Sequence, residues 1–437
     1  MITTIVITAL TCIALILIIL TSPVLRIGRY RLRILYWFAP LLGALLLLAT
    51  GRILPQQIWE GLTGAGAINP LKILVLFISM TELSIFLDEA GMFAYLAGAL
   101  VNKFGHNQKK LFLTLYLTVS ILTVFTSNDI IILTFTPFIC YFAKNAGIDP
   151  MPYLFGEFVA ANTFSMVLII GNPTNIYLAG SAGISFFDYT AVMLVPTLLA
   201  GVVAFGILWL LFRKQLRMPM TPTPSHAKIE SRALVLIGVL HLGICTILLV
   251  LSSYLGFEMW LITLLFALSL FLCVLVHQRL RRRKTNILLH TLVRAPWELI
   301  PFVLSMFVIV LSLHTCGVTG NIAAFLGEDC AVLKYGVASF FSANLINNIP
   351  MAVLFSAITE NLSGAGMAPA LYASVIGSNL GAYLTPIGAL AGIMWSGILG
   401  KMGLSFSFRK FASLGFRVAI PTLLAALGGL MLVMQCL

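Results

Sequence analysis

Long apolar runs, separated by short polar or basic segments, recur along the whole chain. Many of them reach the ~20 residues that a helix needs to cross the hydrocarbon core of a bilayer. This pattern predicts a polytopic helical membrane protein. The segment at residues 91–101 is too short to cross alone. The predicted simple spans are roughly residues 2–22, 34–50, 71–87, 187–212, 233–252, 257–277, 299–316 and 418–436.

Two further apolar segments, residues 153–187 and 369–400, contain helix-breaking residues. The first carries the sequence GNPTN at residues 171–175, and the second carries LTPIG at residues 384–388. Proline lacks a backbone donor and clashes with the preceding turn. Unpaired backbone at membrane depth persists only where protein or a water-filled cavity satisfies it. We therefore predict two broken helices, in which the glycines permit close backbone approach and free φ. The breaking residues are Gly171, Pro173, Pro386 and Gly388.

Two apolar segments with a polar centre predict re-entrant hairpins. Residues 111–142 have Asn128 near the centre, and residues 334–358 have Asn347 and Asn348. Basic residues flank the first segment at Lys110 and Lys144, which places both of its ends on one side of the membrane. Two half-length helices joined by a polar tip satisfy that constraint.

The two halves repeat the same pattern. The spacing of Asn162 and Gly171 equals that of Asn379 and Gly388, and other Pro, Ser and Gly positions recur in the same order. The predicted fold is an all-α polytopic membrane protein with two inverted-topology repeats. The first repeat is 1–217, with scaffold spans in 1–101, a hairpin and broken helix in 111–187, and the span 187–212. A cytoplasmic linker at 218–232 leads to the second repeat, 233–437.

The formal charge of +12 bears on the predicted orientation in the membrane rather than on the predicted class of protein. Basic residues collect in cytoplasmic loops, so the charge predicts neither nucleic acid nor an acidic partner. A topology that places both termini outside leaves three basic residues on the outer side, Arg52, Lys72 and Lys334. With 60% hydrophobic and 9% charged residues, a soluble domain is excluded. The seven cysteines include no CxxC pair, so we expect no metal centre.

The hairpin tips and helix breaks are expected to meet near the membrane midplane as a polar solute site. Amide and hydroxyl side chains suit a small polyhydroxyl or oxyanion solute, although any one of them could simply cap a half-helix. Carboxylates inside a membrane are costly and mark function, so we assign proton or cation coupling to Asp129 and Glu82. The predicted solute-binding residues are Asn128, Asn162, Thr163, Asn172, Thr174, Asn175, Asn347, Asn348, Ser378, Asn379 and Thr385.

No Walker A, HExxH or GxSxG motif occurs, so we predict no enzymatic activity and no cofactor. Several stretches, however, resemble the arsenite/antimonite efflux permease family, the arsenical pump membrane proteins of the ion transporter superfamily. They include TSNDIIILTFTPFI, INNIPMAVLFSAI and YASVIGSNLGAYLTPIGALAGIMW. The resemblance implies proton-coupled export of arsenite or antimonite across the inner membrane, possible assistance by a separate arsenical pump ATPase, and a possible homodimer.

Two departures from that family pattern keep other substrates open. Asn379 stands where the family commonly has an acidic residue, and GNPTNI stands where SNLVNI-like residues are common. The alternatives are a sodium- or proton-coupled carrier for a small organic or inorganic anion and a sodium/proton antiporter. Two hypotheses from other functional classes are a passive channel and a non-transporting scaffold subunit.

Overall fold

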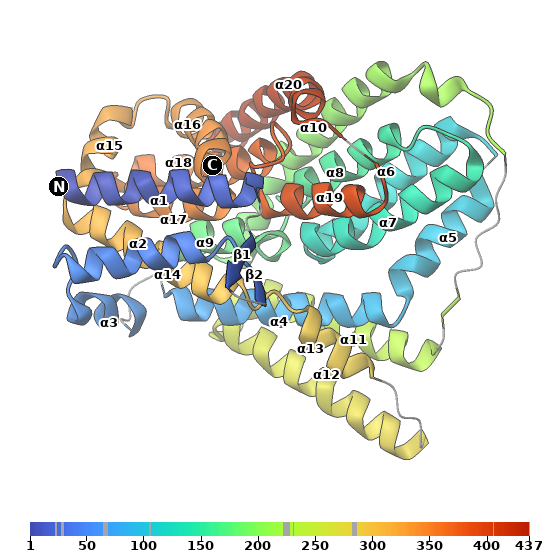
Figure 1. The fold of residues 1–437 in the computed structure, drawn as a ribbon, viewed down its shortest axis with the longest axis horizontal. Helices are drawn as coiled ribbons and strands as arrows, with labels where there is room; N and C mark the ends of the chain where they lie inside the picture. Colours follow the sequence, from blue (N-terminus) through green and yellow to red (C-terminus); the bar gives the residue numbers. More distant parts are fainter. Residues whose placement is uncertain are drawn as a thin grey trace.

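The computed structural model describes residues 1–21, 24–27, 30–63, 69–104, 106–221, 228–229, 231–281, 286–404 and 406–436. Figure 1 shows a helical molecule in which most long helices run side by side along one direction. Within the described residues, eight helices are long and apolar enough to cross a membrane. The prediction of a helical polytopic protein is therefore confirmed. Part of the predicted linker, residues 222–227 and 230, lies outside the described residues.

The first half begins with helices that match the predicted scaffold spans. One feature was not predicted. The arginine-rich segment between the first two spans, which we expected to be a loop, contains an antiparallel pair of strands, β1 and β2. The elements are α1 (Ile2–Thr21), β1 (Val24–Ile27), β2 (Tyr30–Arg33), α2 (Phe38–Ala49), α3 (Pro55–Thr63), α4 (Pro70–Glu89) and α5 (Met92–Phe104).

The rest of the first half contains a two-helix hairpin and an interrupted helix. The hairpin is α6 (Gln108–Phe125) and α7 (Asn128–Ala146). The interrupted helix is α8 (Met151–Phe164), the short 3-10 turn η1 (Ile169–Gly171) and α9 (Pro173–Ser181). A long helix, α10 (Phe186–Phe212), and a second 3-10 turn, η2 (Gln215–Arg217), complete it.

From residue 299 onward, the second half presents the same kinds of helix in the same order as the first half does from residue 70. A hairpin of α16 and α17 is again followed by a helix that stops and restarts, here as α18 and α19. The elements are α11 (Arg232–Leu255), α12 (Met259–Arg281), α13 (Ile287–Arg294), α14 (Leu299–Thr315), α15 (Val318–Leu326), α16 (Ala331–Ile346), α17 (Asn348–Thr359), α18 (Gly364–Gly381), α19 (Leu390–Lys401) and α20 (Phe408–Cys436).

The helices differ sharply in how much of their surface the protein covers. In the most apolar stretch of α4, 78% of the residues are buried, whereas the corresponding share is only 28% in α11 and in α12. An apolar helix that is buried all round belongs to the core, and one that exposes apolar side chains suits a lipid environment. Helix α4 is thus a central element, and α11 and α12 form an outer layer against it, as Figure 1 shows at its lower edge.

The two halves exchange contacts throughout. Helix α4 of the first half packs against α11 and α12, and α14 of the second half packs against α2. At the centre, α9 packs on α17 and α19 packs on α7, so the second part of each broken helix lies on the hairpin of the other half. Helices α10 and α20 pack against each other. This exchange brings the two helix breaks and the two hairpin tips into one buried region.

Candidate functional site

The first hairpin tip is tied to the first broken helix by side-chain amides. Ser127 caps α7, because its Oγ accepts a hydrogen bond from the backbone N of Asp129 at 3.3 Å. Asn128 Nδ2 donates to Oδ1 of Asn162 on α8 at 3.0 Å, and Asn162 itself is completely buried. Asn162 also donates back to the carbonyl of Phe158 in its own helix. The pair therefore fixes the tip of the hairpin against α8.

A second amide network joins the two halves at the first helix break. Asn172 Nδ2 and Ser165 Oγ both donate to Oδ1 of Asn379, at 2.8 and 2.9 Å. Asn379 Nδ2 in turn donates to Oδ1 of Asn175 at 2.7 Å. Asn175 Nδ2 donates to the carbonyls of Ser165 and Leu168 at the interruption of the helix, and the carbonyl of Leu168 also accepts from the backbone N of Gly171. These side chains satisfy one another and the broken backbone.

The second hairpin tip contacts the second helix break through backbone groups. Asn347 Nδ2 donates to the carbonyl of Ile387 at 3.0 Å, and the backbone N of Asn348 donates to the carbonyl of Gly388 at 3.1 Å. Asn347 has φ +73° and ψ +154°, a backbone region that residues other than glycine rarely occupy. The tip is therefore held in a strained conformation against the break, which is a feature of functional sites.

Thr385 lies on the edge of the same region and pairs with Asn344, a side chain that the sequence analysis did not include among the predicted solute-binding residues. Its Oγ1 donates to Oδ1 of Asn344 at 2.7 Å. Asn344 Nδ2 donates to the carbonyls of Phe340 and Gly381, each at 3.0 Å. Asn344 thus covers the last carbonyl of α18 next to the second break.

Both predicted helix-breaking glycines lie against backbone. A Cβ at Gly171 would be 2.3 Å from the carbonyl oxygen of Ser165, and a Cβ at Gly388 would be 2.6 Å from that of Gly381. Neither glycine is among the described residues with positive φ, so the expectation that they use free φ is wrong. Close approach is the physical reason for glycine at these two positions.

Three predicted site residues keep a buried polar atom without a hydrogen-bond partner among the described residues. They are Thr174 Oγ1, Asn348 Oδ1 and Ser378 Oγ. Thr163 does have one, because its Oγ1 donates to the hydroxyl of Tyr383 at 3.4 Å. A buried polar group without a partner costs about 1–3 kcal/mol, so these atoms are candidates for contact with a solute or water.

Asp129 lies apart from the amide network and lines a cavity of about 580 Å³. The cavity is bounded by α4, α7, α19 and the segment that connects α13 to α14. Ser127, Thr81, Tyr36, Arg294 and Glu298 also line it. Of the predicted site residues, only Asp129 borders this cavity, and the sequence analysis missed the contribution of Arg294 and Tyr36. No sequence signal placed those two residues near the hairpin tip.

Glu82 is a buried carboxyl on α4, and its side chain is only 4% exposed. Neither of its oxygens has a hydrogen-bond partner in the described part of the chain. A carboxyl group in such surroundings is costly when it is ionised and inexpensive when it carries a proton. Its neighbour in sequence, Thr81, lines the cavity that contains Asp129.

Comparisons with known proteins agree with this architecture. The profile of the family described as "Citrate transporter" matches residues 15–377. The "Arsenical pump membrane protein" of Escherichia coli (strain K12) is 29% identical, covering 91% of this chain and 93% of the relative. That of Yersinia enterocolitica is 27% identical, covering 82% and 85%. The solved structure of the Alcanivorax borkumensis YdaH transporter covers 99% of this chain and 97% of its own, with a TM-score of 0.54 and 16% identity, and so supports the fold.

Proposed function

This chain belongs to the citrate transporter family, and from that premise we propose that it exports arsenite or antimonite in exchange for protons by alternating access. That it is a multi-pass membrane carrier and not an enzyme follows from the family and its relatives. The solute, the proton coupling and the location in the inner membrane, with both termini outside, are the proposal.

One observation carries the proposal: the carboxyl group of Asp129, at a hairpin tip, borders a cavity that Glu298 also lines, and its sequence neighbour Asn128 belongs to a buried set of uncharged amides and hydroxyls. Trivalent arsenic at neutral pH is an uncharged trihydroxide, which amides and hydroxyls can bind without a fixed charge. A carboxyl group is not needed for that binding, so its function is better explained by a coupled proton. The relatives named as arsenical pump membrane proteins support the same solute.

The recurrence of the same elements in both halves supports an inverted repeat and a rocking motion of the hairpins and broken helices. The name of the relatives, which describes a pump component, supports a separate ATPase as an additional partner. A homodimer is a further part of the proposal.

The second candidate is a cation-coupled carrier for a small anion. The family description favours it, and so does Arg294, whose guanidinium borders the same cavity as Asp129. Arg294 is, however, paired with two carboxylates, Asp88 and Glu89, which leaves no excess positive charge for an anion. A sodium/proton antiporter would use Asp129 to exchange the two cations and would carry no other solute.

Everted membrane vesicles can decide between these functions. We expect arsenite to accumulate in vesicles when a pH gradient, acid inside, is imposed. Citrate should not accumulate in place of arsenite, and a sodium gradient should not drive accumulation in place of the pH gradient. Asp129→Asn should abolish uphill accumulation while preserving exchange of labelled arsenite at equilibrium, because asparagine keeps the shape and cannot carry a proton. Accumulation of citrate instead of arsenite, or undiminished uphill transport by Asp129→Asn, would overturn the proposal.

A further inference from the structure

A second cavity, of about 730 Å³, lies at the C-terminal end of α4 and is lined by residues of α11, α12, α13 and the end of α4. Its lining is polar although it lies between helices of the apolar outer layer. The residues that face it include Arg281 and His277 from α12, Asn286 and His290 from the start of α13, and Ser231 before α11.

Among the residues that the structure describes, Glu89 supplies the one carboxyl group that lines this second cavity, and it is already engaged. Glu89 Oε1 accepts from Arg294 Nη1, and Glu89 Oε2 lies 3.4 Å from Nδ1 of His290. The second nitrogen of the Arg294 guanidinium, Nη2, lies 2.7 Å from Oδ2 of Asp88. With Glu89 held by Arg294 and His290, the rest of the described lining presents the guanidinium of Arg281 together with imidazole, amide and hydroxyl groups. These are the donors that bind phosphate.

The surfaces beside the second cavity are apolar and uncovered. On α12, Leu272, Leu275 and Leu280 are 63%, 54% and 79% exposed, and on α11, Leu236 is 58% exposed. A ligand with a phosphate group and hydrocarbon chains would therefore match both the cavity and the flanking helix faces. Basic cavities between helices at the cytoplasmic side of a membrane bind anionic headgroups in this way.

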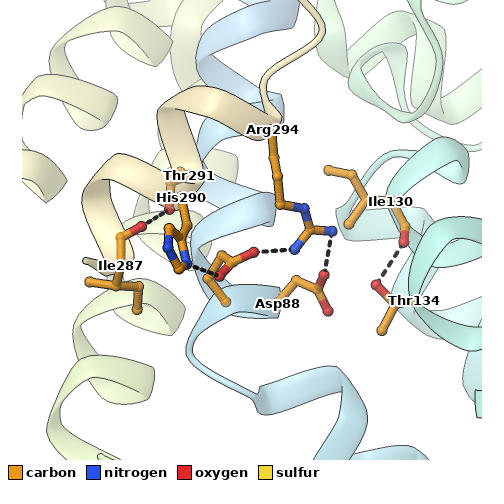
Figure 2. Close-up of polar contacts among 8 residues, drawn as sticks. Asp88, Ile130, Thr134, Ile287, His290, Thr291 and Arg294 are labelled. Carbon is orange, nitrogen blue, oxygen red and sulfur yellow. Dashed lines mark hydrogen bonds and ion pairs between the residues drawn. The ribbon is translucent and has the colours of Figure 1, made fainter. Parts of the chain in front are cut away.

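We propose that the cavity between α11, α12 and α13 binds the phosphate headgroup of an anionic membrane lipid, whose acyl chains lie along the exposed faces of α11 and α12. Figure 2 shows the polar contacts between α13 and the end of α4: His290 and Arg294 extend toward α4, and Arg294 donates to Asp88. Arg294 also lines the Asp129 cavity. A headgroup bound at Arg281 and His290 therefore holds α13 where it closes one wall of that cavity.

The test uses the purified full-length chain in nanodiscs of phosphatidylcholine with increasing fractions of phosphatidylglycerol. Bound lipid is counted by native mass spectrometry, and the thermal midpoint is measured in parallel. We expect phosphatidylglycerol to be retained by the wild type and to raise its midpoint. In Arg281→Gln the affinity should fall about tenfold, because one charge-assisted hydrogen-bonded contact is lost.

Arg279→Gln is the matched control, since Arg279 is an exposed arginine on the same helix that does not line the second cavity. It should change the affinity less than twofold. Equal losses in both variants would show attraction to the surface charge alone and overturn the proposal. If inorganic phosphate stabilises the protein as much as phosphatidylglycerol does, the cavity binds the free anion rather than a lipid headgroup, and the proposal is overturned. These readouts require no transport, so their failure is distinct from failure of the proposed function.

Discussion

Asn172 donates its side-chain amide to Asn379 at 2.8 Å, across 207 residues of sequence and from one half of the chain to the other. Each residue belongs to a different broken helix, and both are buried. Asn172 also caps α9, because its Oδ1 accepts from the backbone N of Thr174 at 3.1 Å. One amide thus begins a half-helix and joins it to the opposite repeat.

Removing that link should destabilise the protein. Asn379→Ala leaves two buried groups without their partner, Nδ2 of Asn172 and Oδ1 of Asn175, whereas Ser165 Oγ keeps its hydrogen bond to the carbonyl of Asn162. At about 1–3 kcal/mol for each unsatisfied buried group, the thermal midpoint in detergent should fall by many degrees. Thr114→Ala is the control, because Thr114 bonds only carbonyls of its own helix. A midpoint equal to that of the control would show that water replaces the network.

Alanine at the two helix breaks should abolish transport and lower stability. The added Cβ would lie 2.3 Å from a backbone oxygen in Gly171→Ala and 2.6 Å from one in Gly388→Ala, so the two helix segments must separate. Gly206→Ala on α10 is the matched control, because nothing lies within 4 Å of its Cβ position. That variant should be neutral or gain about 0.5–1 kcal/mol. Arsenite flux and the thermal midpoint, measured on the same preparations, check this prediction; full flux in both break variants would contradict it.

Glu82→Leu should preserve or increase stability while impairing coupling. The carboxyl is buried and has no hydrogen-bond partner among the described residues, so an apolar side chain of similar volume removes a cost of about 1–3 kcal/mol. If Glu82 carries protons with Asp129, the variant should exchange solute but lose uphill flux. Thermal unfolding and vesicle flux measure the two effects separately. A strongly lowered midpoint would reveal a partner for the carboxyl that this conformation does not contain.

The N-terminal end of α4 offers a pH-dependent contact. Lys72 Nζ donates to Oε2 of Glu258 at 2.5 Å, and the hydrogen bonds from Lys72 and Trp260 hold the pKa of the Glu258 carboxyl below its usual value of 4.5. A lowered pKa in the folded state stabilises the protein above the unfolded value, and this stabilisation is lost as the pH falls through the folded value. The pair is exposed, so we expect only about 0.2–1 kcal/mol. The difference in midpoint between wild type and Glu258→Gln should disappear in acid; a constant difference would exclude the ion pair as its source.

The proposed inversion predicts opposite sides of the membrane for equivalent residues. Asp188 lies in the first turn of α10, and Arg409 lies in the first turn of α20; both are exposed. In a background without the native cysteines, a membrane-impermeant maleimide added to whole cells should label Asp188→Cys and not Arg409→Cys. Everted vesicles should give the reverse. Labelling of both positions from the same side would reject the inverted repeat.

The sequence predicted the apolar helices and the two helix breaks because each depends on local chemistry. It predicted half-length helices in the first hairpin, whereas α6 and α7 are 18 and 19 residues long. An apolar run of sufficient length, an Asn between two such runs, and a glycine beside a proline each predict a local structure wherever the chain folds. Asn347 and Asn128 therefore lie at helix junctions, as expected for hairpin tips. The strand pair at Val24–Arg33 was missed, since a short basic segment between two spans has no comparable signal.

The division of the site into an amide network and a separate cavity could not be predicted. It depends on which helix of one half packs on which helix of the other. Arg294 is distant from Asp129 in sequence, and only the packing of α13 on α4 brings it to the same cavity. Likewise, the sequence pattern cannot show that the side-chain Nδ2 of Asn175 donates its hydrogen bonds to carbonyls of its own broken helix.

The exchange of broken helices between the halves has a consequence for synthesis in the cell. When the first half has entered the membrane, α7 and α9 still lack the helices on which they pack, α19 and α17. The buried amides of Asn172 and Asn175 then also lack Asn379, and polar groups without a partner at membrane depth are unfavourable. The central region can close only after α19 has been synthesised and inserted, near the end of translation. Until then, the half-made carrier depends on the insertion machinery or on water at the membrane surface to shield these groups.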